Sequence, residues 1–123
     1  MKNVFIILRA YSWPASAVPV LLGSVIAYNA GAFSWTNFAL TLLAALLVHS
    51  GANLANSYYD FKNGVDKLEF ADDRGLVDGL LTPRTALRLT LALFAASAVL
   101  GVFLSLKHNL PGMLWLGAGG FCL

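Results

Sequence analysis

Four polar residues, His49, Asn53, Asn56 and Asp60, recur at intervals of three or four positions in an otherwise apolar segment. At about 100° per residue they would fall near 0°, 40°, −20° and 20°, on one stripe of a helix. Polar groups at membrane depth are costly and usually face a cavity or a partner. The alternative role is hydrogen bonding between helices. We favour that role for His49, and both roles stay open for Asn53.

The stripe leads directly into an acidic segment that begins at Asp60. Asn63-Gly64 is a helix-ending signal, which would turn the chain back so that Asp66 approaches Asp60. Two carboxylates and the amide oxygen of Asn56 around one point suit Mg²⁺, which typically binds one or two carboxylates together with substrate phosphates. A solvated charged loop is the alternative, because most charge runs are exposed. Spacing alone leaves both interpretations open.

Farther along this segment, Arg74 offers the forked donors that suit phosphate oxygens. Thr82-Pro83 is a helix-start signal, with threonine as the N-cap and proline at the first helical position. The polar segment should therefore give way to another helix at this point.

Apolar spans must position these residues. A spanning helix needs about 20 mostly apolar residues, and the segments 11–30, 38–59 and 89–106 approach or meet that length. The loop 62–88 separates the second and third spans. A fourth apolar segment, 113–123, is too short to cross, so we expect the chain to be the N-terminal part of a single transmembrane domain. The expected fold class is all-α: a polytopic transmembrane helical bundle with three full spans and the start of a fourth.

Composition and charge agree with a membrane location. Of the 123 residues, 59% are hydrophobic and 11% are charged, whereas soluble domains carry about 25% charged residues. The net charge of +2 gives no reason to expect a nucleic-acid partner. Five of the eight Lys and Arg lie in the 62–88 loop, and Lys2 and Arg9 precede the first span. We therefore expect an integral protein of the cell (inner) membrane, with its N-terminus and this loop in the cytoplasm.

Two stretches resemble the UbiA superfamily of aromatic prenyltransferases. The first resembles its first Asp-rich motif and reads Asn53-Leu-Ala-Asn56-Ser-Tyr-Tyr-Asp60-Phe-Lys-Asn-Gly64-Val-Asp66, followed by Asp72-Asp73-Arg74-Gly-Leu-Val-Asp78. The second resembles the first helix of the menaquinone branch and reads Arg9-Ala-Tyr-Ser-Trp13-Pro14-Ala-Ser-Ala-Val-Pro19-Val-Leu-Leu-Gly23. That branch comprises the bacterial 1,4-dihydroxy-2-naphthoate polyprenyltransferases and their animal vitamin K2-forming relatives. The resemblance covers essentially the whole chain.

The resemblance implies nine spans around a cavity open to lipid, with two Asp-rich motifs that hold Mg²⁺ and an isoprenoid diphosphate. Carried over by position, Asn56, Asp60 and Asp66 would be catalytic and would bind Mg²⁺ through the diphosphate. Arg74, with Asp73 nearby, would bind the diphosphate itself. Further candidates are Asn53 and Arg9, the latter at the mouth of the cavity. The second Asp-rich motif is absent from this chain, so we expect the chain to be inactive alone.

The activity implied is transfer of a polyprenyl group from a polyprenyl diphosphate to an aromatic quinone precursor such as 1,4-dihydroxy-2-naphthoate. Positive charge near the diphosphate stabilises the leaving group, and a dry pocket protects the carbocation. Another aromatic acceptor remains an alternative. So does a non-enzymatic transporter or scaffold segment, although that would predict acidic residues inside several spans. The CDP-alcohol phosphotransferases need an Asp-Gly-x-x-Ala-Arg core, whereas Asp78-Gly79 is followed by Leu80-Leu81-Thr82-Pro83.

Overall fold

The computed structural model describes residues 2–64, 76 and 78–108. All regular structure in these ranges is helical, as the sequence predicts. Along the chain the elements are α1 (Lys2–Ile7), the 3₁₀ helix η1 (Ala10–Ser12), α2 (Pro14–Asn29), α3 (Trp35–Lys62) and α5 (Pro83–Lys107). The predicted fourth span, 113–123, lies outside the described residues.

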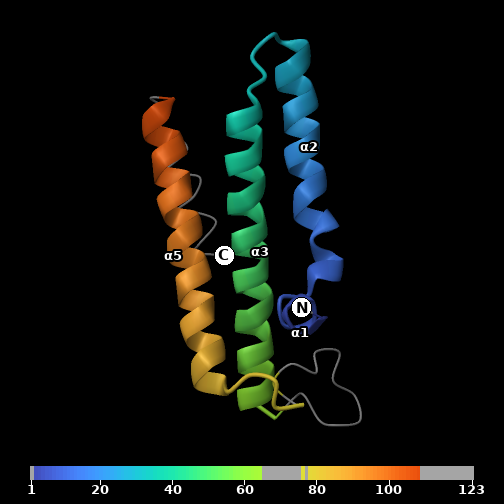
Figure 1. Cartoon of the computed structure of the whole chain (residues 1–123), viewed down its shortest axis with the longest axis vertical. Helices are drawn as coiled ribbons and strands as arrows, with labels where there is room; N and C mark the ends of the chain where they lie inside the picture. Colours follow the sequence, from blue (N-terminus) through green and yellow to red (C-terminus); the bar gives the residue numbers. More distant parts are fainter. Residues whose placement is uncertain (1, 65–75, 77, 109–123) are drawn as a thin grey trace.

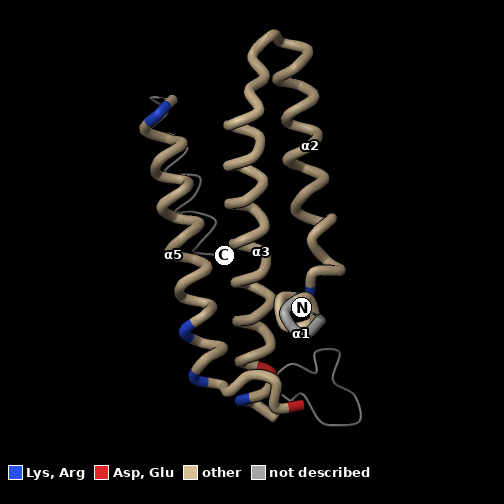
Figure 2. The backbone as a smooth tube through the Cα atoms, in the orientation of Figure 1, with Lys and Arg blue, Asp and Glu red and all other residues tan. Residues whose placement is uncertain are grey.

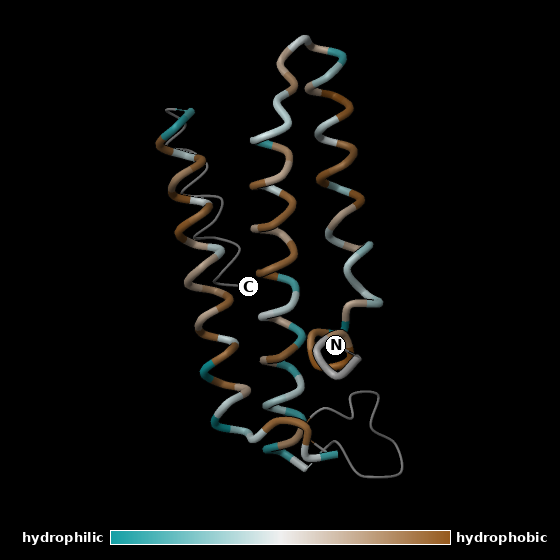
Figure 3. The backbone as a smooth tube through the Cα atoms, viewed as in Figure 1, coloured by the Kyte–Doolittle hydropathy of each residue, from teal (hydrophilic) through white to brown (hydrophobic). Residues whose placement is uncertain are grey.

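Three helical segments are long and apolar enough to cross a membrane: Ala10–Asn29, Trp35–Lys62 and Pro83–Lys107. They run side by side, with α3 between α2 and α5 (Figure 1). Apolar residues predominate along α5 and in the first half of α3, whereas hydrophilic residues are frequent in the second half of α3 (Figure 3). Large apolar side chains such as Val18, Leu22 and Ile26 are exposed along α2. A surface of this kind suits lipid or further helices as its surroundings.

The helix ends follow local capping signals. The side chain of Ser34 caps α3 by accepting a hydrogen bond from the backbone N–H of Asn37, and Thr82 caps α5 through Thr85. At the end of α3, Gly64 has φ +69°, a left-handed conformation that glycine adopts without a steric cost. Both signals read from the sequence, at Asn63-Gly64 and Thr82-Pro83, are confirmed.

The helices α3 and α5 are longer than the apolar segments that predicted them. α3 begins at Trp35 and ends at Lys62, whereas the apolar run spans 38–59. α5 begins at Pro83, so its first turns occupy the last part of the expected polar loop 62–88. The hydrogen bonds of a helix continue until a capping residue ends them, and hydrophobicity marks only the part that suits lipid.

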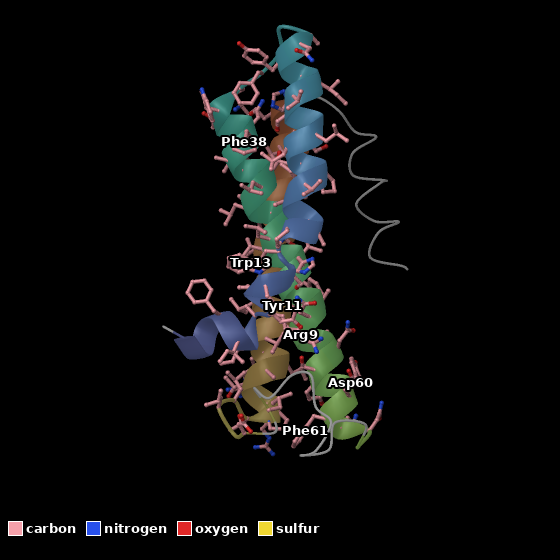
Figure 4. All side chains as sticks on the ribbon, turned by 90° about the vertical axis from the view of Figure 1, so that its right-hand side faces the viewer. Arg9, Tyr11, Trp13, Phe38, Asp60 and Phe61 are labelled. Carbon is pink, nitrogen blue, oxygen red and sulfur yellow. The ribbon has the colours of Figure 1, made fainter. Side chains whose placement is uncertain are left out.

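The first span contains a break that the sequence analysis did not predict. The span Ala10–Asn29 agrees with the expected segment 11–30, but residues 10–12 form a 3₁₀ turn and the α-helix α2 begins only at Pro14. Arg9 has φ 50° and ψ 48°, the left-handed region, which separates α1 from this turn. As a result α1 lies across the bundle, seen end-on in Figure 1 and from the side in Figure 4.

The tightest packing joins α3 to α5. Gly51 of α3 lies directly against the ring of Phe94 of α5. At the end of the bundle where α3 finishes, a small core gathers one buried residue from each of four segments: Ile7 (α1), Leu54 (α3), Leu76 and Ala86 (α5). This core holds α1 and Leu76 against α3, which carries the polar stripe, and against α5.

Candidate functional site

Most charged residues of the described ranges lie at one end of the bundle (Figure 2). α3 ends there with Asp60 and Lys62, and α5 begins there with Arg84 and Arg88. At the opposite end, Lys107 donates a hydrogen bond to Asn37 Oδ1 over 3.1 Å. The molecule therefore has a charged end and a mostly uncharged end, separated by the apolar middles of three helices.

Asn56 and Asp60 lie at the charged end, on one face of α3. Both belong to the continuous helix Trp35–Lys62, and a separation of four residues places their side chains next to each other. Asn56 is exposed and Asp60 is partly exposed. Neither side chain is hydrogen-bonded to another described residue. The last turns of α3 thus present one amide and one carboxylate at an accessible surface.

Higher on the same stripe, His49 makes two hydrogen-bonding contacts to the first span. Its Nε2 lies 2.7 Å from Ser12 Oγ, and its Nδ1 lies 2.8 Å from Ser16 Oγ. Both ring nitrogens thus face serine hydroxyls of the neighbouring segment. The expectation that His49 joins helices is confirmed.

Asn53 continues this contact one turn nearer to Asp60. Its Nδ2 donates to Ser12 Oγ over 3.0 Å and to the carbonyl oxygen of Leu8 over 3.5 Å. Of the two roles left open for Asn53, its amide nitrogen therefore performs interhelical bonding. Nearby, Trp13 Nε1 donates to Ser50 Oγ over 3.0 Å, which adds a further bond between the same segments.

Arg9 lies at the junction between α1 and η1, at the same end of the bundle as Asp60 (Figure 4). Its side chain is partly buried. Its carbonyl oxygen accepts hydrogen bonds from the backbone N–H of Ser12 at 2.9 Å and from Ser12 Oγ at 2.8 Å. The backbone that carries Arg9 is therefore tied to the residue that His49 and Asn53 contact.

Three of the predicted site residues, Asp66, Asp73 and Arg74, lie outside the described residues. Leu76, two positions after Arg74 in the sequence, is described and is buried in the core with Ile7 and Leu54. Asp78 is exposed on the same segment.

The donor atoms of the described part of the site suit a hard divalent cation. A carboxylate at Asp60 and an amide oxygen at Asn56 are oxygen ligands, and Mg²⁺ takes one or two carboxylates while substrate phosphates and waters complete its shell. Within the described ranges, no group of three His, Cys, Asp or Glu comes together. Asn56 and Asp60 alone would therefore leave most coordination positions of such a cation to phosphate, water or other residues.

Sequence reasoning missed Ser12 and Ser16. They are four positions apart, on one face of the first span, and both contact His49. Small hydroxyl residues at that spacing are a recognised helix-packing signal. Further serines are buried in α3 and α5: Ser50, Ser57, Ser97 and Ser105.

Comparison with known proteins adds a family match. A model described as the UbiA prenyltransferase family matches residues 16–123. The chain is 42% identical over 99 residues to the UbiA prenyltransferase domain-containing protein 1 homolog of Drosophila melanogaster, covering 78% of the chain and 27% of that protein. It is 36% identical over 115 residues to the UbiA prenyltransferase domain-containing protein 1 of Danio rerio, covering 89% of the chain and 34% of that protein.

The human protein of the same name is 40% identical over 93 residues, covering 75% of the chain and 27% of that protein. The chain thus spans about a quarter to a third of the length of these curated relatives. No solved structure gave a significant match.

Proposed function

The chain belongs to the UbiA prenyltransferase family, and from that premise we propose that it forms the first half of the active site of a Mg²⁺-dependent aromatic prenyltransferase. The substrate donor is a polyprenyl diphosphate, and the acceptor is an aromatic quinone precursor. One observation supports the proposal most strongly. The polar stripe of α3 ends in Asn56 and Asp60 at the charged end of an otherwise apolar bundle.

This arrangement suits a substrate with one charged end and a long apolar tail. Asp60 and Asn56 face the end of the bundle that a soluble diphosphate group could reach, together with Asp66 as a third ligand. Arg74, with Asp73 nearby, contacts the diphosphate oxygens. Bound there, Mg²⁺ would neutralise charge on the leaving diphosphate. The apolar helices give the isoprenoid tail an environment of matching polarity.

The protein's own residues then serve two needs of the reaction: they stabilise the leaving group and they exclude water. The allylic carbon–oxygen bond breaks and its electron pair leaves with the diphosphate, so cationic side chains at Arg74 and Arg9 stabilise the departing charge. A ring carbon of the acceptor supplies the pair for the new carbon–carbon bond and afterwards loses a proton. Apolar walls keep water away from the allylic cation until that bond forms.

We further propose 1,4-dihydroxy-2-naphthoate as the acceptor, which would place the reaction in menaquinone biosynthesis. The support is the resemblance of residues 53–78 and 9–23 to the menaquinone branch. The charged end of the bundle would face the cytoplasm of the cell membrane, because Lys and Arg concentrate on that side of membrane proteins.

The test is an assay of the full-length protein in membranes or detergent. Polyprenyl diphosphate is supplied with 1,4-dihydroxy-2-naphthoate or with 4-hydroxybenzoate, in the presence of Mg²⁺ or of EDTA. The proposal predicts a prenylated naphthoate product that disappears when EDTA removes Mg²⁺. A product with 4-hydroxybenzoate alone would contradict the acceptor only. Absence of prenyl transfer with both acceptors would contradict the activity.

A further inference from the structure

The hydroxyl group of Ser12 connects α3 to the backbone of Arg9. Ser12 Oγ lies 2.8 Å from the carbonyl oxygen of Arg9, 2.7 Å from His49 Nε2 and 3.0 Å from Asn53 Nδ2. No other serine of the described first span has more than one such contact between side chains. Ser24, for comparison, only donates to the carbonyl oxygen of Val20 in its own helix.

The directions of the hydrogen bonds at the Ser12 hydroxyl can be assigned. A carbonyl oxygen cannot donate, so Ser12 gives its single proton to Arg9 and accepts from Asn53 and from His49. His49 Nε2 is then the donor toward Ser12 Oγ, and its Nδ1 lies 2.8 Å from the hydroxyl oxygen of Ser16. Both ring nitrogens thus have a hydrogen-bond partner within the span, where an unsatisfied polar group would be costly.

Helix association alone does not require such an arrangement. His49 lies near the middle of α3, roughly 20 Å from either end at about 1.5 Å per residue. Small apolar residues would pack two helices there without burying polar groups. Hydrogen bonds add direction: they fix the rotation of the Ala10–Ser12 turn relative to the stripe that ends in Asp60.

The position of Arg9 depends on that rotation. Arg9 is the only described non-glycine residue with positive φ, a conformation that costs roughly 1–3 kcal/mol and persists only when its surroundings hold it. Two hydrogen bonds from Ser12 to the Arg9 carbonyl do so. Through Ser12, the side chains of His49 and Asn53 therefore help to hold the backbone from which the side chain of Arg9 extends.

We infer that Ser12 and His49 are positioning residues, which hold Arg9 where it contacts the diphosphate of the substrate. The inference rests on the proposed function, because it assigns the anion that Arg9 meets. It goes beyond that function by giving a role to a polar group in the middle of the membrane. Neither Ser12 nor His49 touches the reacting atoms.

The test compares Ser12→Ala and His49→Phe with Ser24→Ala, which removes a serine hydroxyl from the same span without touching this group. Binding of inorganic pyrophosphate in the presence of Mg²⁺ and the KM for polyprenyl diphosphate are measured on the full-length protein. Ser12→Ala and His49→Phe should each raise the dissociation constant for pyrophosphate and the KM about tenfold. This is the scale of one displaced hydrogen bond to a charged group. Ser24→Ala should leave both unchanged. Ser12→Thr, which keeps the hydroxyl, should restore binding.

An Arg9→Ala background separates positioning from general damage. If Ser12 and His49 act through Arg9, adding Ser12→Ala to Arg9→Ala should weaken pyrophosphate binding no further. An equal loss in both backgrounds, or no loss relative to Ser24→Ala, would overturn the inference while leaving the proposed function intact. A wild-type protein that binds no pyrophosphate would overturn both. Because Ser12→Ala removes only one oxygen atom, we expect this variant to fold. It therefore tests the inference even if His49→Phe fails to accumulate in the membrane.

Discussion

Gly51 of α3 faces the ring of Phe94 of α5 so closely that a β-carbon at position 51 would stand 2.9 Å from Cε1 of Phe94. The two helices are in close contact here, two residues before Asn53 and five before Asn56 along α3. This contact sets the separation between the helix that carries the polar stripe and the helix that follows the acidic segment.

Gly51→Val should therefore destabilise the bundle, because the ring of Phe94 must move or the helices must separate. Overpacking of this kind costs roughly 1–3 kcal/mol, so the midpoint of thermal unfolding in detergent should fall by several degrees. Gly101→Ala is the matched control, since nothing lies within 4 Å of a β-carbon there. Equal midpoints for Gly51→Val and the wild type would contradict the close contact.

The N-cap of α5 gives a second stability prediction. Thr82 Oγ1 accepts from the backbone N–H of Thr85 over 3.3 Å, and losing such a cap typically costs about 1 kcal/mol. Thr82→Ala should lower the thermal midpoint, and Thr82→Ser should retain most of it. Thr36→Ala changes an exposed threonine in the first turn of α3 that is not a cap, so it should have little effect. A similar loss in Thr36→Ala and Thr82→Ala would argue against a specific capping role.

Topology can be tested with single cysteines at the two ends of the bundle. In a Cys122→Ser background, Lys62→Cys should react with a membrane-impermeant maleimide only from the cytoplasmic side. Asn29→Cys, at the other end of α2, should react only from the opposite side. Both positions are exposed. The reverse pattern in sealed vesicles of known orientation would contradict the proposed orientation of the site.

Much of the helical architecture could be predicted from the sequence, because hydrophobic length and capping residues act locally. The three spans follow from uncharged stretches, and the end of α3 at Asn63-Gly64 and the start of α5 at Thr82-Pro83 follow from residue types. The bonding of His49 to a neighbouring helix also follows, since a polar ring at membrane depth needs partners.

The break at Arg9 could not be predicted in the same way. Its left-handed backbone is stabilised by Ser12, whose hydroxyl is in turn oriented by His49 and Asn53, 37 and 41 positions away in the chain. Nothing local marks an arginine for such a conformation. The site itself could be predicted only as far as Asn56 and Asp60 share a face of α3, while the approach of Asp66 stays a prediction.

The uncharged end of the bundle should be dispensable for chemistry. Lys107→Ala removes the hydrogen bond to Asn37 but no residue of the proposed site. Turnover by the full-length protein should stay within about twofold of wild type, because surface substitutions away from the site usually have small effects. A large loss of turnover, with normal amounts of protein in the membrane, would show that the reaction depends on this end as well.

The most direct test of the account is the turnover of Asp60→Asn in the full-length protein, assayed with polyprenyl diphosphate, aromatic acceptor and Mg²⁺. Turnover should fall by at least about 100-fold, the scale of losing one major electrostatic contact to the transition state. Turnover of Asp66→Asn should fall as far. Turnover of Asn56→Ala should fall less, because the amide is a neutral ligand. Turnover of His49→Ala should fall least, because the imidazole acts between helices. If Asp60→Asn is present at normal levels in the membrane and keeps near wild-type turnover and Mg²⁺ dependence, the proposed diphosphate site is wrong.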